Sequence, residues 1–279
     1  MESLWGYVAE IFLFFQDDLI LTMERPMNQI FKATSVAIFS FLFSLTVFAD
    51  NHMEAPQDAA LEIYQCNFSD NKDLNDTRKI AAKWDKWADK NYTVPYAGYL
   101  MTPYYQRKSD FPYDLFWLGV TEDFTSPGQA QDEWAAKGTK LAAEFDAANP
   151  CPNHAAVYSF TVRQPKNQTP DGYLTISGCT NKEGSSQADF AAANAKQNQY
   201  LDSINVDSGI YYWFMGAGSG IEQAYDYLEV YAHSTLKEWG VTPDNFLSGN
   251  PGPTDLDELR ECDTPRVYAI EYVGGKTQN

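Results

Sequence analysis

Between residues 61 and 163, short apolar segments with strand composition alternate with longer amphipathic segments. In 73–90, Ile80, Trp84 and Trp87 recur four and three positions apart, which predicts a helix with one apolar face. A second helix is predicted from Ser126, a capping residue before a proline, to about Ala147. Strands are predicted at 61–67, 96–105, 113–120 and 155–163.

The same order of elements recurs in the second half of the chain. Strands are predicted at 173–179, 210–215, 225–233 and 266–273, with a helix at 187–204 and a shorter one beginning at 234–240. Each half is therefore a βαββαβ unit of ferredoxin-like type. We expect a first unit at 61–163, a linker at 164–172 that contains two prolines and a glycine, a second unit at 173–273 and a tail at 274–279.

The four cysteines support a duplication. Cys66 and Cys179 end the first strand of their unit, while Cys151 and Cys262 precede the last strand, at nearly equal separations. The first and last strands of this unit are neighbours in its sheet, so the expected disulfides are Cys66–Cys151 and Cys179–Cys262. No Cys-x-x-Cys pair is present, and no metal site is predicted.

The N-terminal region has the pattern of an export signal. Lys32 precedes an apolar run at 33–49 that ends in Val47-Phe48-Ala49, which predicts cleavage after Ala49 and a mature tail at 50–60. Residues 1–26 are acidic, unlike the start of a signal peptide, and a true start at Met27 would account for them. An uncleaved anchor is the alternative, but no cationic stop-transfer cluster follows the run. An even number of cysteines agrees with a periplasmic or secreted protein.

The composition restricts the partners. The chain has 38 acidic and 20 basic residues and a net charge of −18. Such a surface repels the phosphates of nucleic acids and the anionic headgroups of lipids, so neither is an expected partner, and stable membrane association is not expected after signal cleavage. Aromatic residues make up 15% of the chain, which is enough for an aromatic core or binding surface.

The order of elements over 61–273 resembles the dimeric α+β-barrel superfamily, although no diagnostic motif supports the resemblance. That superfamily includes monooxygenase-like proteins of antibiotic biosynthesis, stress-responsive proteins and chlorite-dismutase-like proteins with two fused units. The resemblance implies an α+β fold in which two antiparallel sheets packed face to face enclose a pocket and helices cover the outside. Because both units lie in one chain, we expect the barrel to close within that chain, which makes a monomer possible and leaves the oligomeric state open.

The strand at 225–233 provides the candidate pocket residues. One face carries Leu228, Val230 and Ala232, and the other carries polar-tipped side chains. We expect the polar-tipped face to point into the barrel, since polar groups beneath helices would lack partners. The candidates on this face are Tyr225, Tyr227, Glu229, Tyr231 and His233, joined by Trp117 and Asp123 from the matching strand of the first unit. The alternative is that these tyrosines only fill an interface between sheets.

Two classes of function remain open. The first is a binding protein for a small aromatic or amphipathic ligand, non-catalytic or stress-related. The second is an enzyme of the resembling superfamily, either a cofactor-free monooxygenase-like protein or a haem-dependent one. His233 could serve as a general base or as an axial haem ligand, or could be structural at its strand end. No motif identifies a cofactor, and no catalytic residue is assigned.

Signal cleavage gives the first testable prediction. The exported protein should begin at Asp50, because the small residue Ala49 and the preceding pattern suit signal peptidase. The intact mass of the exported protein measures this directly. A mass that retains residues 33–49 would instead identify a membrane anchor.

Overall fold

The computed structural model describes residues 58–109, 111–167, 169–218, 220 and 224–277. The predicted signal segment at 1–49, the alternative start at Met27 and most of the 50–60 tail lie outside these residues, so cleavage stays a prediction. Within the described part of the chain, no helix has the length and apolarity needed to cross a membrane.

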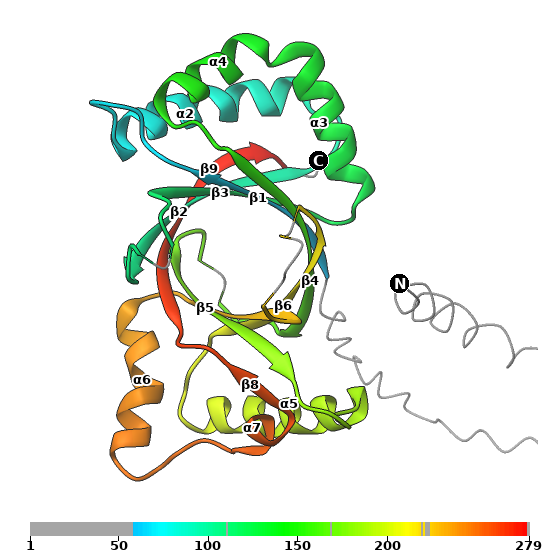
Figure 1. Cartoon of the computed structure of the whole chain (residues 1–279), viewed down its shortest axis with the longest axis vertical. Helices are drawn as coiled ribbons and strands as arrows, with labels where there is room; N and C mark the ends of the chain where they lie inside the picture. The colour runs from blue at the N-terminus through cyan, green and yellow to red at the C-terminus, as the bar shows by residue number, and fades with distance from the viewer. Residues whose placement is uncertain (1–57, 110, 168, 219, 221–223, 278–279) are drawn as a thin grey trace, which may run out of the picture. The chain divides into compact units, whose positions relative to one another are not determined.

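Two successive βαββαβ units form the described chain (Figure 1). The first consists of β1 (Ala59–Cys66), α2 (Leu74–Asn91), β2 (Tyr96–Tyr105), β3 (Leu115–Thr121), α3 (Thr125–Lys137), α4 (Thr139–Ala148) and β4 (Asn153–Arg163). The second consists of β5 (Gly172–Asn181), α5 (Gln187–Ser203), β6 (Gly209–Ala217), β7 (Tyr227–His233), α6 (Leu236–Leu247), α7 (Asp255–Leu259), β8 (Arg260–Cys262) and β9 (Arg266–Lys276).

Two local features differ from the expected elements. The helix predicted from Ser126 to Ala147 is divided into α3 and α4 at Gly138, where a Cβ atom would lie 2.4 Å from the Trp134 ring. The irregular stretch before the last strand contains α7 and the short strand β8, which pairs with β5 through Cys179 and Cys262. The first unit has no counterpart of β8 among its described residues.

Eight strands close into a single antiparallel barrel. The strand order is β4-β1-β3-β2 in the first unit and β9-β5-β7-β6 in the second. The pairs β2–β9 and β4–β6 join the two sheets along both edges. Figure 1 shows α2, α3 and α4 outside one half of the barrel and α5, α6 and α7 outside the other. The expected α+β fold with an intramolecular barrel is confirmed, and its two sheets are hydrogen-bonded as well as facing each other.

Both predicted disulfides are present. Cys66 is bonded to Cys151 and Cys179 to Cys262, with sequence separations of 85 and 83 residues. Each lies on the helix-covered side of its sheet, in clusters with Leu115 and Leu201 respectively. On the chain-entropy model, closing a loop of this length contributes about 4 kcal/mol to stability.

The predicted orientation of β7 is wrong. Leu228 and Val230 belong to the core that fills the barrel, whereas Tyr227 and Tyr231 pack outside it with Leu201 of α5 and its neighbours. The register agrees with this arrangement. Tyr227 pairs directly with Cys179, and opposed residues of an antiparallel pair share a face, so Tyr227 points to the same outer side as the disulfide.

The outward face of β7 is tolerated because its buried charge has a partner. Nη2 of Arg260 lies 2.5 Å from each carboxylate oxygen of Glu229, and both side chains are buried. Arg260 is carried by β8, which the Cys179–Cys262 disulfide attaches to β5. The Glu229 carboxylate therefore does have a partner beneath the helices. That partner, Arg260, comes from a segment in which neither a strand nor a helix was predicted.

Loss of this pair should be costly. Glu229→Gln leaves the Arg260 guanidinium buried without a counter-charge, and we expect it to lower the free energy of unfolding by about 3 kcal/mol. Glu271→Gln is the matched control, because the Arg78–Glu271 pair is exposed and should contribute less than about 1 kcal/mol. Urea unfolding of the disulfide-bonded variants measures both values. Equal losses would show that Glu229 and Arg260 are not a buried pair.

Candidate functional site

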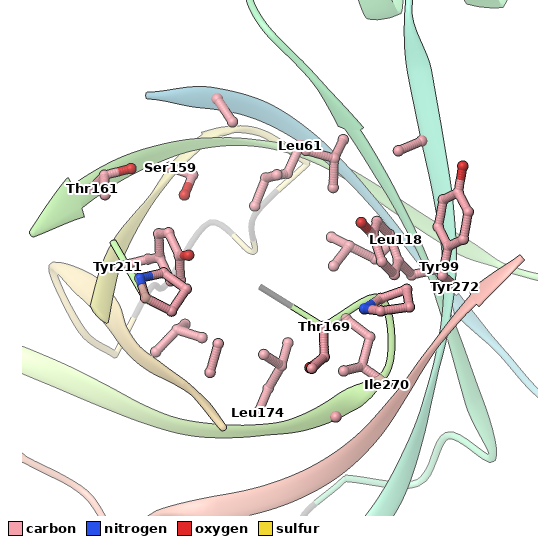
Figure 2. Close-up of a pocket in the computed structure, with 18 of the residues that line it drawn as sticks. Leu61, Tyr99, Leu118, Ser159, Thr161, Thr169, Leu174, Tyr211, Ile270 and Tyr272 are labelled. Atoms are coloured by element: carbon pink, nitrogen blue, oxygen red, sulfur yellow. The ribbon is translucent and has the colours of Figure 1, made fainter. Parts of the chain in front are cut away.

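A cavity of about 560 Å³ occupies one end of the barrel (Figure 2). It lies where β1, β2, β5 and β6 begin and where β3, β4, β7 and β9 end. The opposite end is filled by the large side chains of Met101, Phe116 and Tyr268. The apolar part of the cavity lining includes Leu61, Leu118, Leu174, Val230 and Ile270. The cavity is therefore a continuation of the apolar core that large side chains leave unfilled.

Aromatic side chains stand on opposite walls of the cavity. Tyr99 of β2 and Tyr272 of β9 are cross-strand neighbours whose ring centroids are 5.3 Å apart. Tyr211 and Trp213 of β6 line the other side, and Figure 2 shows Tyr211 across the cavity from Tyr99 and Tyr272. A flat molecule between these walls would contact aromatic surface on both faces.

Two hydroxyl side chains from β4 add polar groups to this lining. Ser159 is paired with Trp213 and Thr161 with Tyr211 across the β4–β6 edge, which places them beside the aromatic wall of β6. Both residues are buried. The lining thus combines apolar contact area with a few hydroxyl groups that can orient a ligand.

The cavity tyrosines are hydrogen-bond donors at neutral pH. Burial raises the pKa of Tyr211 to about 12. The pKa of Tyr99 is raised by burial, then by the neighbouring Tyr272 and the Asp171 carboxylate. Neither phenol is ionised under ordinary conditions, so neither can act as a general base there.

The linker between the units lies over the mouth of the cavity. β4 ends and β5 begins at this end of the barrel, with β6 and β7 between them. The segment that joins β4 to β5 contributes described residues to the cavity lining: Gln164, Pro165, Asn167, Thr169, Pro170 and Asp171. The linker is attached at both ends. The Asp207 carboxylate accepts the backbone N–H groups of Lys166 and Asn167 at 2.6 and 2.8 Å, and that of Asp171 accepts the N–H of Tyr272 at 2.8 Å.

Comparisons with known proteins found similar solved structures at low identity. No protein-family model matches the chain, and no curated protein matches it. A chlorite dismutase from Candidatus Nitrospira defluvii, solved with imidazole, is 9% identical over 76% of this chain and 90% of its own, with a TM-score of 0.49. A dye-decolorizing peroxidase from Bacteroides thetaiotaomicron is 8% identical over 78% and 94%, with a TM-score of 0.47. An anthrone oxidase-like protein is 9% identical over 80% and 96%, with a TM-score of 0.39.

The chain folds into an eight-stranded antiparallel α+β barrel. At these identities and TM-scores the likeness says nothing about activity, which must be argued from the residues of this barrel.

The second-unit candidates do not line the cavity of the α+β barrel with their side chains. Tyr227, Glu229 and Tyr231 lie outside the barrel wall, as described for β7. Tyr225 precedes β7 and packs against the core at the end away from the cavity. The prediction that this face forms the pocket is therefore wrong. The Glu229 carboxylate is paired with Arg260 beneath the helices, and the rings of Tyr227 and Tyr231 pack there as apolar surface, although the Tyr227 hydroxyl is buried without a hydrogen-bond partner among the described residues.

The two first-unit candidates also lie outside the barrel. Trp117 packs edge to face against Trp84 of α2, with a centroid distance of 4.6 Å, and contacts Phe145 of α4. Asp123 accepts the backbone N–H of Ser126 at 2.8 Å, and this hydrogen bond lowers its pKa. Trp117 is therefore a core residue, and Asp123 stabilises the start of α3.

His233 reaches the rim of the cavity, but its ring faces outward. Nδ1 lies 2.7 Å from the Ser208 hydroxyl and Nε2 lies 3.2 Å from the Thr175 hydroxyl. Burial lowers the pKa of His233 to about 4, so the ring is neutral at physiological pH. Both ring nitrogens have partners outside the barrel, which indicates a structural role.

The residues present do not fit a haem held by histidine. His233 faces outward, and His154 lies in β4 with its ring stacked on Tyr64 and its Nε2 3.1 Å from the Glu62 carboxylate. All four cysteines are in disulfides. In the described part of the chain, no histidine ring or thiolate is therefore directed into the cavity, and no haem chemistry is derived.

The cavity lining contains residues that were not predicted from the sequence: Tyr99, Tyr211, Trp213, Tyr272, Ser159, Thr161 and those of the linker. The cysteines offered a signal that could have located them, because a disulfide shows which face of its strand a cysteine occupies. Cys66 bonds to Cys151, which follows α4, so Cys66 must point to the helix-covered side and the alternate residues of β1 inward. Opposed residues of paired strands share a face, so the same alternation can be followed from β1 to β3 and β2. It would have placed Tyr99 inside the barrel and Trp117 outside.

The environment of His233 predicts a pH dependence. The folded state keeps the ring neutral down to about pH 4, while the unfolded chain binds a proton near pH 6.5, so stability falls as the pH is lowered between these values. We expect His233→Gln to remove up to about 3 kcal/mol of this fall. Denaturant unfolding at a series of pH values measures the free energy of unfolding of the variant and the wild type. Above pH 7 this free energy should change with pH to the same extent in both proteins. An unchanged slope at low pH would contradict a buried neutral ring.

Proposed function

We propose that this protein is exported and that it binds a small aromatic or amphipathic molecule inside its barrel, beneath the linker. The observation that carries the proposal is the cavity itself: aromatic rings on opposite walls, an apolar floor and two hydroxyl groups at one edge. Its volume of about 560 Å³ is in the range of small-molecule sites. One chain provides every wall, so binding requires no second copy.

The chemistry of the lining favours binding over acid–base catalysis. Tyr99 and Tyr211, whose pKa values are raised, are protonated near neutral pH, and the ring of His233 is hydrogen-bonded on the other side of the barrel wall. Hydroxyl and phenol groups can donate hydrogen bonds to a ligand, but they do not remove a proton from it under these conditions. The carboxylates of the lining belong to residues at the mouth, so we propose that a molecule held between the aromatic walls is released chemically unchanged.

The proposed location follows from the disulfides. Each of the two disulfides joins the first strand of its unit to the segment just before the last strand, and such bonds persist in oxidising compartments. With the signal-like segment at 33–49, they support export to the periplasm or the exterior.

Binding can be tested with the neutral fluorescent probe N-phenyl-1-naphthylamine. We expect probe fluorescence to rise on binding, and Tyr211→Ala to raise the Kd about tenfold by removing one aromatic wall. Tyr231→Phe is the control, since its ring lies outside the barrel and its binding should match the wild type. Equal Kd values for Tyr211→Ala and the wild type would remove this cavity as the site.

Native mass spectrometry of the protein from its source addresses the alternative. A retained aromatic molecule that is released unchanged supports a binding protein. Release of an oxidised product after incubation in air would overturn the non-catalytic proposal in favour of a cofactor-free monooxygenase-like enzyme.

A further inference from the structure

We infer that the ligand of the barrel is an organic cation, an aromatic or alkyl ammonium compound whose charged group sits against Tyr99, Tyr272 and Asp171. The inference rests on the proposed function and adds to it the charge class of the ligand. It depends on three features of the cavity: the aromatic faces, the carboxylates at the mouth and the position of the single lysine.

The aromatic walls are suited to a cation. A positive group over the face of tryptophan or tyrosine is attracted by the negative potential of the ring, and the attraction grows when water is excluded. Trp213 is buried at the cavity wall, and Tyr99 and Tyr272 form a close pair on the opposite side. A cation in this space would therefore meet ring faces instead of solvent.

The mouth of the cavity is acidic. Its lining includes the carboxylates of Asp58, Glu122, Asp171 and Asp207. Among the described residues, no lysine or arginine forms an ion pair with Asp58 or Asp171. Asp171 accepts the backbone N–H of Tyr272, and Asp58 accepts the backbone N–H of Thr161 and the hydroxyl of Tyr158. These uncharged donors fix the two carboxylates without neutralising them.

The one lysine in the lining does not offset these charges. Lys276 turns its ammonium group toward α2, where it donates to the backbone oxygen of Asp89 at 2.8 Å and lies 3.7 Å from the Asp89 carboxylate. Since its partner is outside the cavity, the field at the mouth stays negative, which attracts cations and repels anions.

Asp171 connects the acidic mouth to the aromatic wall. Its carboxylate is hydrogen-bonded to the backbone of Tyr272, and its charge is near enough to Tyr99 to raise the pKa of that phenol. A cationic group at this point would touch two rings and one carboxylate. The opposite rings of Tyr211 and Trp213 would hold the apolar part of the ligand.

The test compares two probes of the same shape. Benzyltrimethylammonium and its neutral carbon isostere, neopentylbenzene, compete with N-phenyl-1-naphthylamine for the purified disulfide-bonded protein at low ionic strength. We expect the cation to bind at least about fivefold more tightly than the isostere, and this advantage to shrink as salt is added. Equal affinities would overturn the inference while leaving the binding site intact. Failure of all three molecules to bind would overturn the proposed function as well.

A charge-removing variant locates the cation. Asp171→Asn preserves an oxygen that can accept the Tyr272 N–H, so it removes the charge with little change in the linker. We expect it to weaken binding of the ammonium probe about fivefold and to leave the isostere unchanged. Asp226→Asn is the matched control, because Asp226 also accepts a backbone N–H but lies before β7, away from the cavity. An equal effect of both variants would contradict a site at Asp171.

Discussion

Closure of the sheet is the constraint on which the rest of this structure depends. The β2–β9 and β4–β6 pairings leave no free edge between the two units, so the barrel strands have one side toward the interior and one toward the helices. Backbone hydrogen bonds fix the register, and a shift of one residue in any strand would exchange its two faces. Cavity, core and disulfides are therefore consequences of a single set of pairings.

Both faces of the barrel wall are rich in aromatic rings, but the rings pack differently on the two faces. Outside, rings such as Trp84 and Trp117 pack edge to face beneath the helices, and the polar groups among them are paired locally. Inside, the rings are crowded at one end and separated at the other. The two ends of the barrel interior therefore differ in the space between the rings. That space depends on which inward strand positions carry large side chains.

The fold could be predicted from the sequence because its signals are local. The periodicity of Ile80, Trp84 and Trp87 indicates a helix, and the matched cysteines relate the two units. The cavity could not be predicted in the same way. On β7 a tyrosine suits either side of the wall, since its ring is apolar and its hydroxyl needs only one partner. The deciding contact, between Glu229 and Arg260, joins residues whose proximity depends on the short strand β8.

The linker gives the cavity an asymmetry that two separate chains would lack. The two units place equivalent strand ends at the mouth of the cavity. If they were two separate, identical chains related by a two-fold axis, the two halves of the mouth would be identical. Fusion requires one segment to pass from β4 to β5 over this opening. The distance between the ends of β4 and β5 sets the shortest length that this segment can have. A longer segment would change the volume of the cavity beneath it. An insertion or deletion there would alter the shape of the binding space even where every strand keeps its place, so the joint between the units can evolve as a determinant of ligand size.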